Sequence, residues 1–398
     1  MLRKTGYALV LLLAVLAGLV FNFREEVTRL AAVNTLFSPE RIVRNFSHMD
    51  EMFLHAAVPL PGPVRALEGE SAPLPTRLEG LDVADYLSQT ATTSLLVLKD
   101  GRIAHESYRL GTRPDDLRIS WSVAKSVLSL AVGAAVERGE LDLGRTVDSY
   151  VPALADGAYA GVTVEQALRM SSGVSFDEVY LDFWSDINRM GRVLALGGSM
   201  DGFAAARSER ARPAGTVRQY NSIDTHVVAM ALRAATGRSL PAVVGETVLG
   251  PAGLEGPVHY VTDGEGTAFA LGGLNMSTRD YARIGQLVLE GGRVGDRQVV
   301  AADWIARSTA ASAPEPAAPD GFGYGYQWWV PEEAEGVVLG RGVYGQYLWI
   351  DRPRGVVIVK TAANRAFREP GALDRDVRFM DRLAASISAA PAGPRPGS

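Results

Sequence analysis

The pattern of hydrophobic and polar residues divides the chain into an apolar start, a polar connector and a long globular part. Residues 5–23 carry no charge, and their most apolar run is Ala8–Leu13. A helix over this segment would be roughly 28 Å long, close to the thickness of a bilayer's hydrocarbon core. We therefore predict that residues 1–23 form a single transmembrane anchor, with a cleaved signal peptide as the alternative.

The charges beside this segment predict its orientation. Arg3 and Lys4 precede it, whereas the charges that follow it cancel one another. Positive residues favour the cytoplasmic side of a membrane, so the globular part should lie outside the cytoplasm. The expectation is a single-pass protein of the inner, or cytoplasmic, membrane. Cleavage of the segment would instead give a secreted or periplasmic protein.

Residues 24–79 are predicted to be an N-terminal extension and connector. Helical patches reach to about residue 58, and prolines follow at positions 59, 61, 63, 73 and 75. Proline favours an extended backbone, so this connector should lie along a surface. The globular domain, residues 80–390, follows it.

The globular domain begins with a hairpin and a long helix. Two strand-like runs, Ser94–Leu98 and Arg102–Tyr108, flank Asp100-Gly101, a dipeptide typical of tight hairpin turns. An apolar helix is predicted over Ser122–Arg138 and should end at Gly139.

Helices and loops then separate this hairpin from a second group of strands. Residues 140–319 are predicted to be mainly helical, with a capping box at Thr163–Gln166. Four strands and a last helix are expected at Tyr324–Val330, Val337–Gly340, Gln346–Asp351, Gly355–Thr361 and Leu373–Ser388. Residues 391–398 should be a disordered tail.

This order of elements predicts an α/β protein of the α+β type. Residues 80–139 and 320–390 would bear one antiparallel sheet built from both ends of the domain and flanked by helices. The mainly helical subdomain would be inserted between these two parts.

Composition narrows the possible chemistry. The 398 residues include no cysteine, which excludes disulfides, thiolate metal sites and a cysteine nucleophile. The net charge of −5 argues against a nucleic-acid partner, and the five histidines lack the spacing of a zinc hydrolase. Four of the 40 basic residues are lysines, at positions 4, 99, 125 and 360. A buried lysine can lose its proton, whereas arginine cannot, so each lysine is of interest.

One lysine stands in the chain's single S-x-x-K pattern, Ser122-Val123-Ala124-Lys125. Three residues apart on a helix, Ser122 and Lys125 share one face. A serine hydroxyl needs a neighbouring base to become nucleophilic, and a desolvated lysine can be that base. The helix start also leaves the Ser122 N–H free to face a developing oxyanion. The alternative is a serine in a first helical turn beside a surface lysine.

The stretch Ile119–Ser126 resembles the nucleophile motif of the β-lactamase-related serine hydrolases, a superfamily that includes class C β-lactamases, D-alanyl-D-alanine peptidases and esterases. Further matching stretches follow in order, and the resemblance covers roughly residues 35–385; they are Tyr150–Pro152, Met170–Gly173, Gly272–Leu274, Arg279–Arg283 and Gly325–Trp329. The chain is most similar to the 6-aminohexanoate-dimer hydrolase-like branch. The resemblance implies no metal and no cofactor.

The superfamily's second motif, Tyr-x-Asn, corresponds here to Tyr220-Asn221-Ser222. Tyr220 is present, whereas the asparagine stands one place early and Ser222 takes the third place. The resemblance implies that Tyr220 relays a proton between nucleophile and leaving group, because a phenol close to a lysine ammonium can lose its proton. Asn221 and Ser222 are also residue types that cap the helix expected after them, and this alternative stays open.

The third motif, Lys-Thr/Ser-Gly, has two possible counterparts. Lys360-Thr361-Ala362 lacks the glycine and follows a buried-strand run, so we assign it to the next strand over. The better match is Gly342–Gln346, in which Tyr344 and Gly345 are substrate-binding candidates and the Gln346 N–H is the second oxyanion donor. This match lacks the groups that bind a β-lactam carboxylate.

The segment Phe176–Tyr180 resembles the substrate loop of the hexanoate-dimer branch, in which a tyrosine reaches the scissile amide. Tyr180 is therefore a substrate-binding candidate, and an ordinary loop aromatic is the alternative.

Together these features predict a serine hydrolase that cleaves a small-molecule amide or ester through an acyl-Ser122 intermediate. A β-lactamase or D-alanyl-D-alanine carboxypeptidase is one alternative, and a catalytically inactive binder of peptides or cell-wall fragments is another. The sequence leaves the oligomeric state open.

Overall fold

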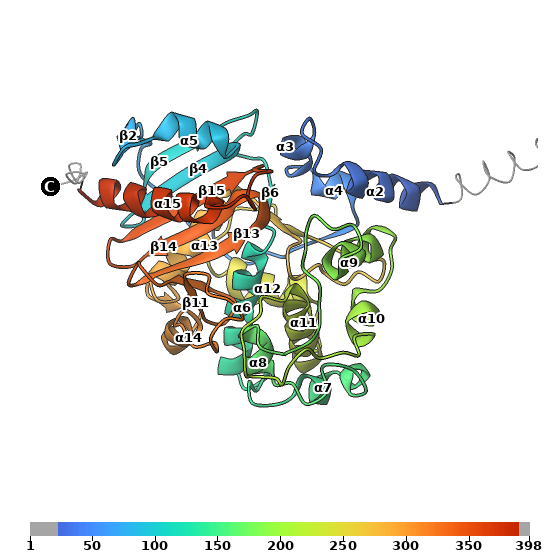
Figure 1. Ribbon diagram of the computed structural model, residues 1–398. Helices are drawn as coiled ribbons and strands as arrows, with labels where there is room; N and C mark the ends of the chain where they lie inside the picture. The colour runs from blue at the N-terminus through green and yellow to red at the C-terminus, as the bar shows by residue number, and fades with distance from the viewer. Residues whose placement is uncertain (1–22, 390–398) are drawn as a thin grey trace, which may run out of the picture.

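The computed structural model describes residues 23–389 (Figure 1). The predicted anchor therefore falls almost entirely outside the described residues, as does the predicted tail from residue 391. Among the described residues, no single helix is long and apolar enough to cross a membrane. One bent pair, Ser222–Thr236 with Leu240–Leu249, meets those criteria only when its two parts are taken together across a 79° bend.

The main sheet has seven antiparallel strands in the order β11-β12-β13-β14-β15-β4-β5. Two come from the start of the domain and form the predicted hairpin, β4 (Thr92–Lys99) and β5 (Arg102–Tyr108). The others come from its end and are β11 (Phe322–Tyr324), β12 (Trp329–Pro331), β13 (Val337–Gly342), β14 (Gln346–Asp351) and β15 (Val356–Ala362). The joining of both chain ends at β15 and β4 confirms the predicted sheet.

One expected strand is two strands in the structure. The segment Tyr324–Val330 turns back on itself, and the Gly325 N–H bonds to the Trp328 carbonyl at 2.9 Å. Gln327 has a positive φ of 65° inside this turn. The aromatic and apolar residues on both sides hid the turn from the hydrophobic pattern.

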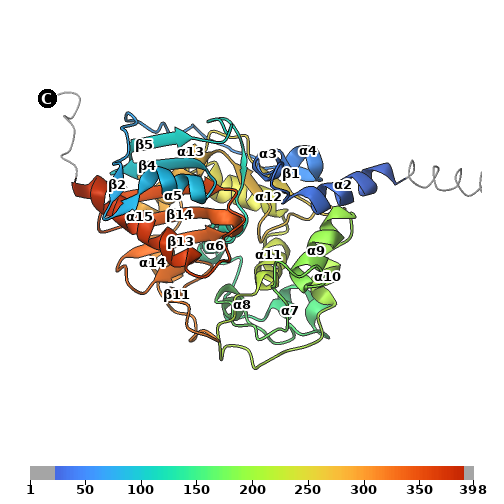
Figure 2. The same cartoon turned by 45° about the horizontal axis from the view of Figure 1, so that its top comes forward.

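Alternation along the strands gives the sheet two apolar faces. On β4, Leu95 and Val97 pack with one cluster, whereas Leu96 and Leu98 pack with the other. The first face is covered by α5 (Val83–Gln89) and the terminal helix α15 (Ala372–Ala389), as Figure 2 shows. The second is covered by α6 (Val123–Glu137) and α13 (Thr278–Leu289).

The close approach of α13 to the sheet depends on Gly285. A Cβ at that position would lie 2.4 Å from Val357 Cγ1 and 2.9 Å from Leu348 Cδ1. Real Cβ atoms do not approach other heavy atoms this closely, because packed interiors leave no such overlap. Glycine here therefore lets the helix lie directly on β14 and β15.

The helical part lies beside the sheet and contains the predicted capping box at Thr163 and Gln166. Its helices are α7 (Val147–Tyr150), α8 (Val164–Leu168), α9 (Asp186–Ala195), α10 (Met200–Ala205), α11 (Ser222–Thr236), α12 (Leu240–Val244) and the π-helix η2 (Gly245–Leu249). A small second sheet joins β1 (His55–Ala57), β7 (His259–Val261), β8 (Leu274–Met276) and β6 (Arg118–Ile119) in that order. The remaining elements are β2 (Arg77–Leu78), β3 (Leu81–Asp82), β9 (Arg293–Val294), β10 (Arg297–Gln298), α14 (Ala302–Ser308) and the 3₁₀ turns η1 (Pro152–Leu154) and η3 (Val343–Gly345).

The N-terminal segment folds onto the helical part. Its helices α2 (Arg24–Thr35), α3 (Ile42–Asn45) and α4 (Met49–Met52) lie above α9 in Figure 1. The buried Arg29 side chain donates from Nε to the Ala195 carbonyl at the end of α9, over 2.9 Å. This segment is therefore part of the folded body, where it reaches the cleft described below.

Candidate active site

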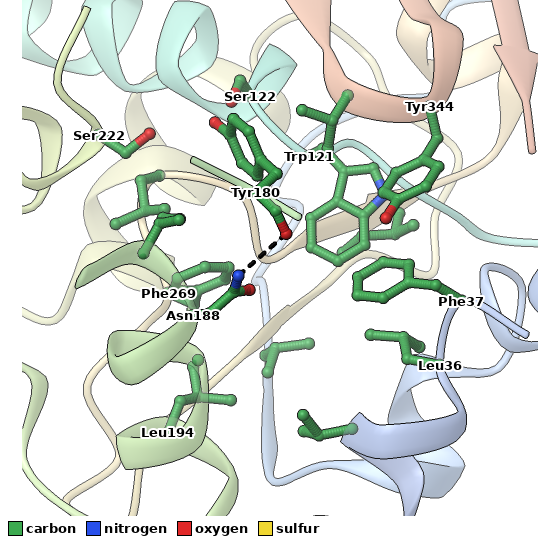
Figure 3. Close-up of a pocket in the computed structure, with 18 of the residues that line it drawn as sticks. Leu36, Phe37, Trp121, Ser122, Tyr180, Asn188, Leu194, Ser222, Phe269 and Tyr344 are labelled. Carbon is green, nitrogen blue, oxygen red and sulfur yellow. Dashed lines mark hydrogen bonds between the residues drawn. The ribbon is translucent and has the colours of Figure 1, made fainter. Parts of the chain in front are cut away.

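Ser122 stands at the N-cap of α6, directly after β6 and a sharp turn. Trp121, the residue before it, has a positive φ of 43°, a conformation that costs free energy in a residue with a Cβ. The Ser122 side chain makes no capping hydrogen bond to α6. Its hydroxyl is therefore not committed to the helix and faces the cleft (Figure 3).

Lys125 lies one turn later on α6 and is 1% exposed. Its Nζ donates to Ser122 Oγ at 2.9 Å, to Ser222 Oγ at 3.0 Å and to the Leu271 carbonyl at 2.9 Å. Burial lowers the pKa of Lys125 to about 7, and the Glu178 carboxylate opposes that shift. The predicted S-x-x-K pair is thus in direct contact and is not a surface lysine beside a capping serine.

Tyr220 lies against the same pair. Its ring centroid is 5.2 Å from Lys125 Nζ, and its ring stacks on Trp329 at 5.1 Å. Burial raises the pKa of the Tyr220 phenol and the Glu178 charge raises it further, while a hydrogen bond with Ser122 opposes the shift. The raised pKa of the Tyr220 phenol therefore disfavours the expected loss of its proton.

Helix α11 receives its N-terminal cap from a distant loop. Glu178 accepts the Ser222 N–H at 2.6 Å and also accepts the Ser222 hydroxyl. Asn221 is the N-cap residue but makes no side-chain cap; its Nδ2 donates to the Val174 carbonyl instead. Capping by Asn221 or Ser222 side chains, the open alternative from the sequence, is therefore wrong. A carboxylate at a helix N-terminus is stabilised by the free N–H groups there.

Tyr180 reaches the same carboxylate from the loop that carries Glu178. Its phenol donates to Glu178, and its backbone carbonyl accepts from Asn188 Nδ2 at 2.9 Å. Burial and the Glu178 charge raise the pKa of the Tyr180 phenol, so it stays protonated. Figure 3 shows its ring beside Ser122, facing the cleft.

The segment matched to the third motif forms a tight turn between β13 and β14. Tyr344 and Gly345 both have positive φ, 60° and 86°. A Cβ at Gly345 would lie 3.2 Å from Lys360 Nζ, so this position favours glycine. The Gln346 side chain donates to the Ala362 carbonyl at 2.8 Å, which fixes its backbone at the start of β14. Lys360 lies on β15, the strand next to β14, as expected, and it pairs there with Tyr347 of β14.

Glu178 is the site residue that sequence reasoning missed. It accepts hydrogen bonds from Tyr180 and Ser222 and alters the pKa of Lys125 and Tyr220. In the sequence it is one of several acidic residues in a polar loop. No local pattern distinguishes it, because its partners on α11 are more than 40 residues away.

Two cavities meet at Ser122. One, of about 770 Å³, is mainly apolar and extends from Ser122 toward the N-terminal helices and α9. The other, of about 480 Å³, is lined by Tyr220 and by charged groups that include Arg341, Arg368 and Asp374. Tyr180 lines both cavities. Ser122 thus stands where a substrate could extend to either side of a reacting carbonyl.

Comparisons with known proteins show the family of the chain. The family model described as Beta-lactamase matches residues 82–379. A 6-aminohexanoate-dimer hydrolase from Paenarthrobacter ureafaciens is 31% identical over 332 residues, covering 80% of this chain and 84% of the relative.

Solved structures show the same fold. A Bacillus anthracis protein, provisionally described as a 6-aminohexanoate-dimer hydrolase, superimposes with a TM-score of 0.78 at 22% identity, over 90% of this chain and 97% of that one. A family VIII carboxylesterase gives a TM-score of 0.59 at 17% identity, over 81% of this chain and 100% of that one. These matches confirm the predicted resemblance and fold class. The chain therefore belongs to the Beta-lactamase family and is a homologue of the 6-aminohexanoate-dimer hydrolases.

Proposed function

We propose that this hydrolase-family chain is a serine hydrolase that cleaves an amide or ester bond through an acyl-Ser122 intermediate. The observation that carries the proposal is the contact of the buried Lys125 Nζ with Ser122 Oγ at 2.9 Å. With a pKa of about 7, Lys125 is neutral in a large fraction of molecules at neutral pH. A neutral amine can take the serine proton, which a surface lysine cannot do at that pH.

In the first half-reaction, Ser122 Oγ bonds to the substrate carbonyl carbon while Lys125 takes its proton. The carbonyl oxygen becomes an oxyanion that the N–H groups of Ser122 and Gln346 would stabilise. The bond from the carbonyl carbon to the leaving oxygen or nitrogen then breaks. Tyr220 donates its proton to the leaving atom and recovers one from Lys125. Water hydrolyses the acyl-serine ester by the reverse set of proton transfers.

Ser222 and Glu178 would hold this machinery in position. Ser222 bonds to Lys125 Nζ at 3.0 Å and to Glu178, so it ties the base to the start of α11. Glu178 in turn holds the phenol of Tyr180, which lines both cavities. Tyr180 would turn its phenolic O–H from Glu178 to a leaving amine, the role that its family resemblance suggested.

A fluorophosphonate probe tests the proposal directly. The full chain should be labelled at a single residue, and peptide mapping should find that residue to be Ser122. Absence of labelling, together with no turnover of p-nitrophenyl esters, would favour the inactive-binder alternative. A panel of p-nitrophenyl esters, D-Ala-D-Ala peptides and linear amides would then define the bond that is cleaved.

A β-lactamase or D-alanyl-D-alanine carboxypeptidase remains the second candidate. The third motif lacks a cation, but Arg341 and Arg368 bring guanidinium groups to the polar cavity from other elements. These groups could hold a substrate carboxylate. We nevertheless expect weak nitrocefin turnover, since the Lys-Thr-Gly position holds Val343-Tyr344-Gly345. Efficient turnover at micromolar nitrocefin would favour the second candidate.

The location is a separate proposal. Residues 1–23 would anchor the chain in the inner membrane with its catalytic domain outside the cytoplasm. The full chain should sediment with membranes and resist extraction by salt and carbonate. A soluble product shortened at its N-terminus would instead show that the segment is cleaved.

A further inference from the structure

Part of the wall of the apolar cavity beside Ser122 comes from residues that precede the matched family region, which begins at residue 82. Helices α2 and α4 and the residues around them line one side of the cavity, and α9 lines the side that faces them (Figure 3). The apolar side chains from these two parts are Val33, Leu36, Phe37, Met49, Phe53, Ile187 and Leu194. Its volume of about 770 Å³ is that of a pocket for a small organic molecule.

The proposed mechanism assigns the two halves of a substrate to the two cavities. Tyr220 lines the polar cavity and is not among the residues that line the apolar one. The leaving atom must lie within hydrogen-bond reach of the phenol that protonates it. The leaving group should therefore occupy the polar cavity, and the acyl group should extend into the apolar cavity.

The charges around the apolar cavity disfavour a positively charged acyl group. Its charged lining residues are Arg192, Arg365 and Glu369. Glu369 is exposed and also lines the polar cavity, so it belongs to the entrance. The Arg192 guanidinium lies 4.0 Å from the Phe183 ring centroid. Arg365, like Glu369, is exposed and belongs to the entrance. An ammonium at the end of an acyl chain would therefore face apolar walls and the half-buried Arg192, which costs free energy.

We propose that the site selects substrates whose acyl half is an uncharged, apolar chain longer than acetyl, with the N-terminal segment forming part of the acyl pocket. The inference rests on the proposed function, because it requires acyl transfer to Ser122. Burial of each methylene against apolar side chains such as Leu36, Phe37 and Leu194 should strengthen binding by roughly fourfold. The selectivity should therefore grow with chain length until the pocket is full.

Three p-nitrophenyl esters test the proposal: the acetate, the hexanoate and the 6-aminohexanoate. They share one leaving group, so differences in kcat/KM report on the acyl half. The kcat/KM for the hexanoate should exceed that for the acetate by about tenfold or more. It should exceed that for the 6-aminohexanoate by about a hundredfold. Equal rates for all three esters, or a preference for the ammonium-bearing ester, would overturn the acyl-pocket proposal and leave the serine hydrolase intact. Absence of turnover of every ester would count against the proposed function itself.

A substitution that fills part of the apolar cavity tests whether the acyl group binds there. Gly191 lies on α9, lines the apolar cavity, and would place a Cβ where no atom lies within 4 Å. Gly191→Leu should reduce the hexanoate-to-acetate ratio by about tenfold, and leucine suits a helix better than glycine does. The matched control is Arg189→Leu, which introduces leucine at an exposed position of the same helix. Arg189 does not line the cavity. Equal ratios in the wild type and both variants would place the acyl group elsewhere.

Discussion

The candidate site has two parts that differ in how firmly the fold holds them. The first stands on the starts of α6 and α11, where Lys125 is 1% exposed and bonds to Ser122, Ser222 and a backbone carbonyl. The second is the loop that carries Glu178 and Tyr180. The loop exposes 56% of Val179 and 79% of Leu181, yet both functional side chains point inward.

This difference suggests a division of labour. Residues fixed by buried helices would carry the bond-making and proton-transfer steps, which require constant distances. The loop would add a carboxylate and a phenol that adjust those steps for particular substrates. Substitutions in the helix-borne part should therefore have large effects on all substrates, and substitutions in the loop should have smaller, selective ones.

The largest effect is expected for Ser122→Ala. Removal of the nucleophile should abolish fluorophosphonate labelling and reduce kcat/KM by at least about 10⁴-fold. The fold should persist, because the Ser122 side chain makes no capping hydrogen bond that alanine would lose. A thermal melt checks the fold. An unchanged esterase rate in this variant would remove Ser122 from the mechanism.

Lys125→Arg should be nearly as damaging as Lys125→Ala. Arginine keeps the positive charge but cannot act as a base near neutral pH. Because the site is fully buried, Lys125→Met serves as a variant of similar length without a charge, and its thermal melt shows whether the pocket tolerates substitution. If a folded Lys125→Arg protein kept more than about a tenth of kcat/KM, a loss below ~1.4 kcal/mol, Lys125 would be a charge partner and not the base.

Tyr220→Phe should lower hydrolysis of esters and amides alike, by about 10²-fold or more, since every acylation needs the proton relay. The ring itself would be retained, with its stacking on Trp329. The measurement is kcat/KM on an ester and an amide with the same acyl group. A variant as active as the wild type would exclude the second motif from the mechanism.

Tyr180→Phe should be selective. Its single phenolic O–H donates to Glu178 and would turn to a leaving amine, which leaves poorly without protonation. We expect about a tenfold loss on the amide and little change on an activated ester. The same matched pair of substrates decides the matter, and equal losses on both would place Tyr180 with the helix-borne residues.

The sequence predicted where the helix-borne residues stand relative to their helices, because the evidence for each position is local. Ser122 and Lys125 are three residues apart at the start of the apolar run of α6, and Tyr220 comes two residues before α11. The seven-stranded sheet followed from strand patterns at both ends of the domain, except where a turn divides Tyr324–Val330.

The features of the site that the sequence could not predict depend on long-range contacts. The Glu178 cap on α11 joins residues distant in the chain, and the cavity wall formed by the N-terminal helices depends on how α2 packs on α9. The raised pKa of Tyr220 also depends on burial, which a motif does not reveal. These features are the ones that distinguish this chain's site from the motif alone.

The smallest expected effect concerns pH and Glu178. If neutral Lys125 is the base, kcat/KM should rise with pH through the lysine's pKa of about 7. The Glu178 carboxylate favours the charged lysine and so raises that pKa. Glu178→Gln removes the charge but keeps an oxygen that can accept the Ser222 N–H. The rising limb of the pH profile should therefore move to lower pH.

Asp177→Asn is the matched control, because it removes one negative charge from the same loop at an exposed position. Water screens an exposed charge far more than a buried one, so this variant should leave the limb where it is. A limb that stays in place in Glu178→Gln would mean that the group titrating in the profile is not Lys125. A shift to higher pH would mean that the variant had changed the burial of the site, because loss of the carboxylate charge can only lower the lysine's pKa.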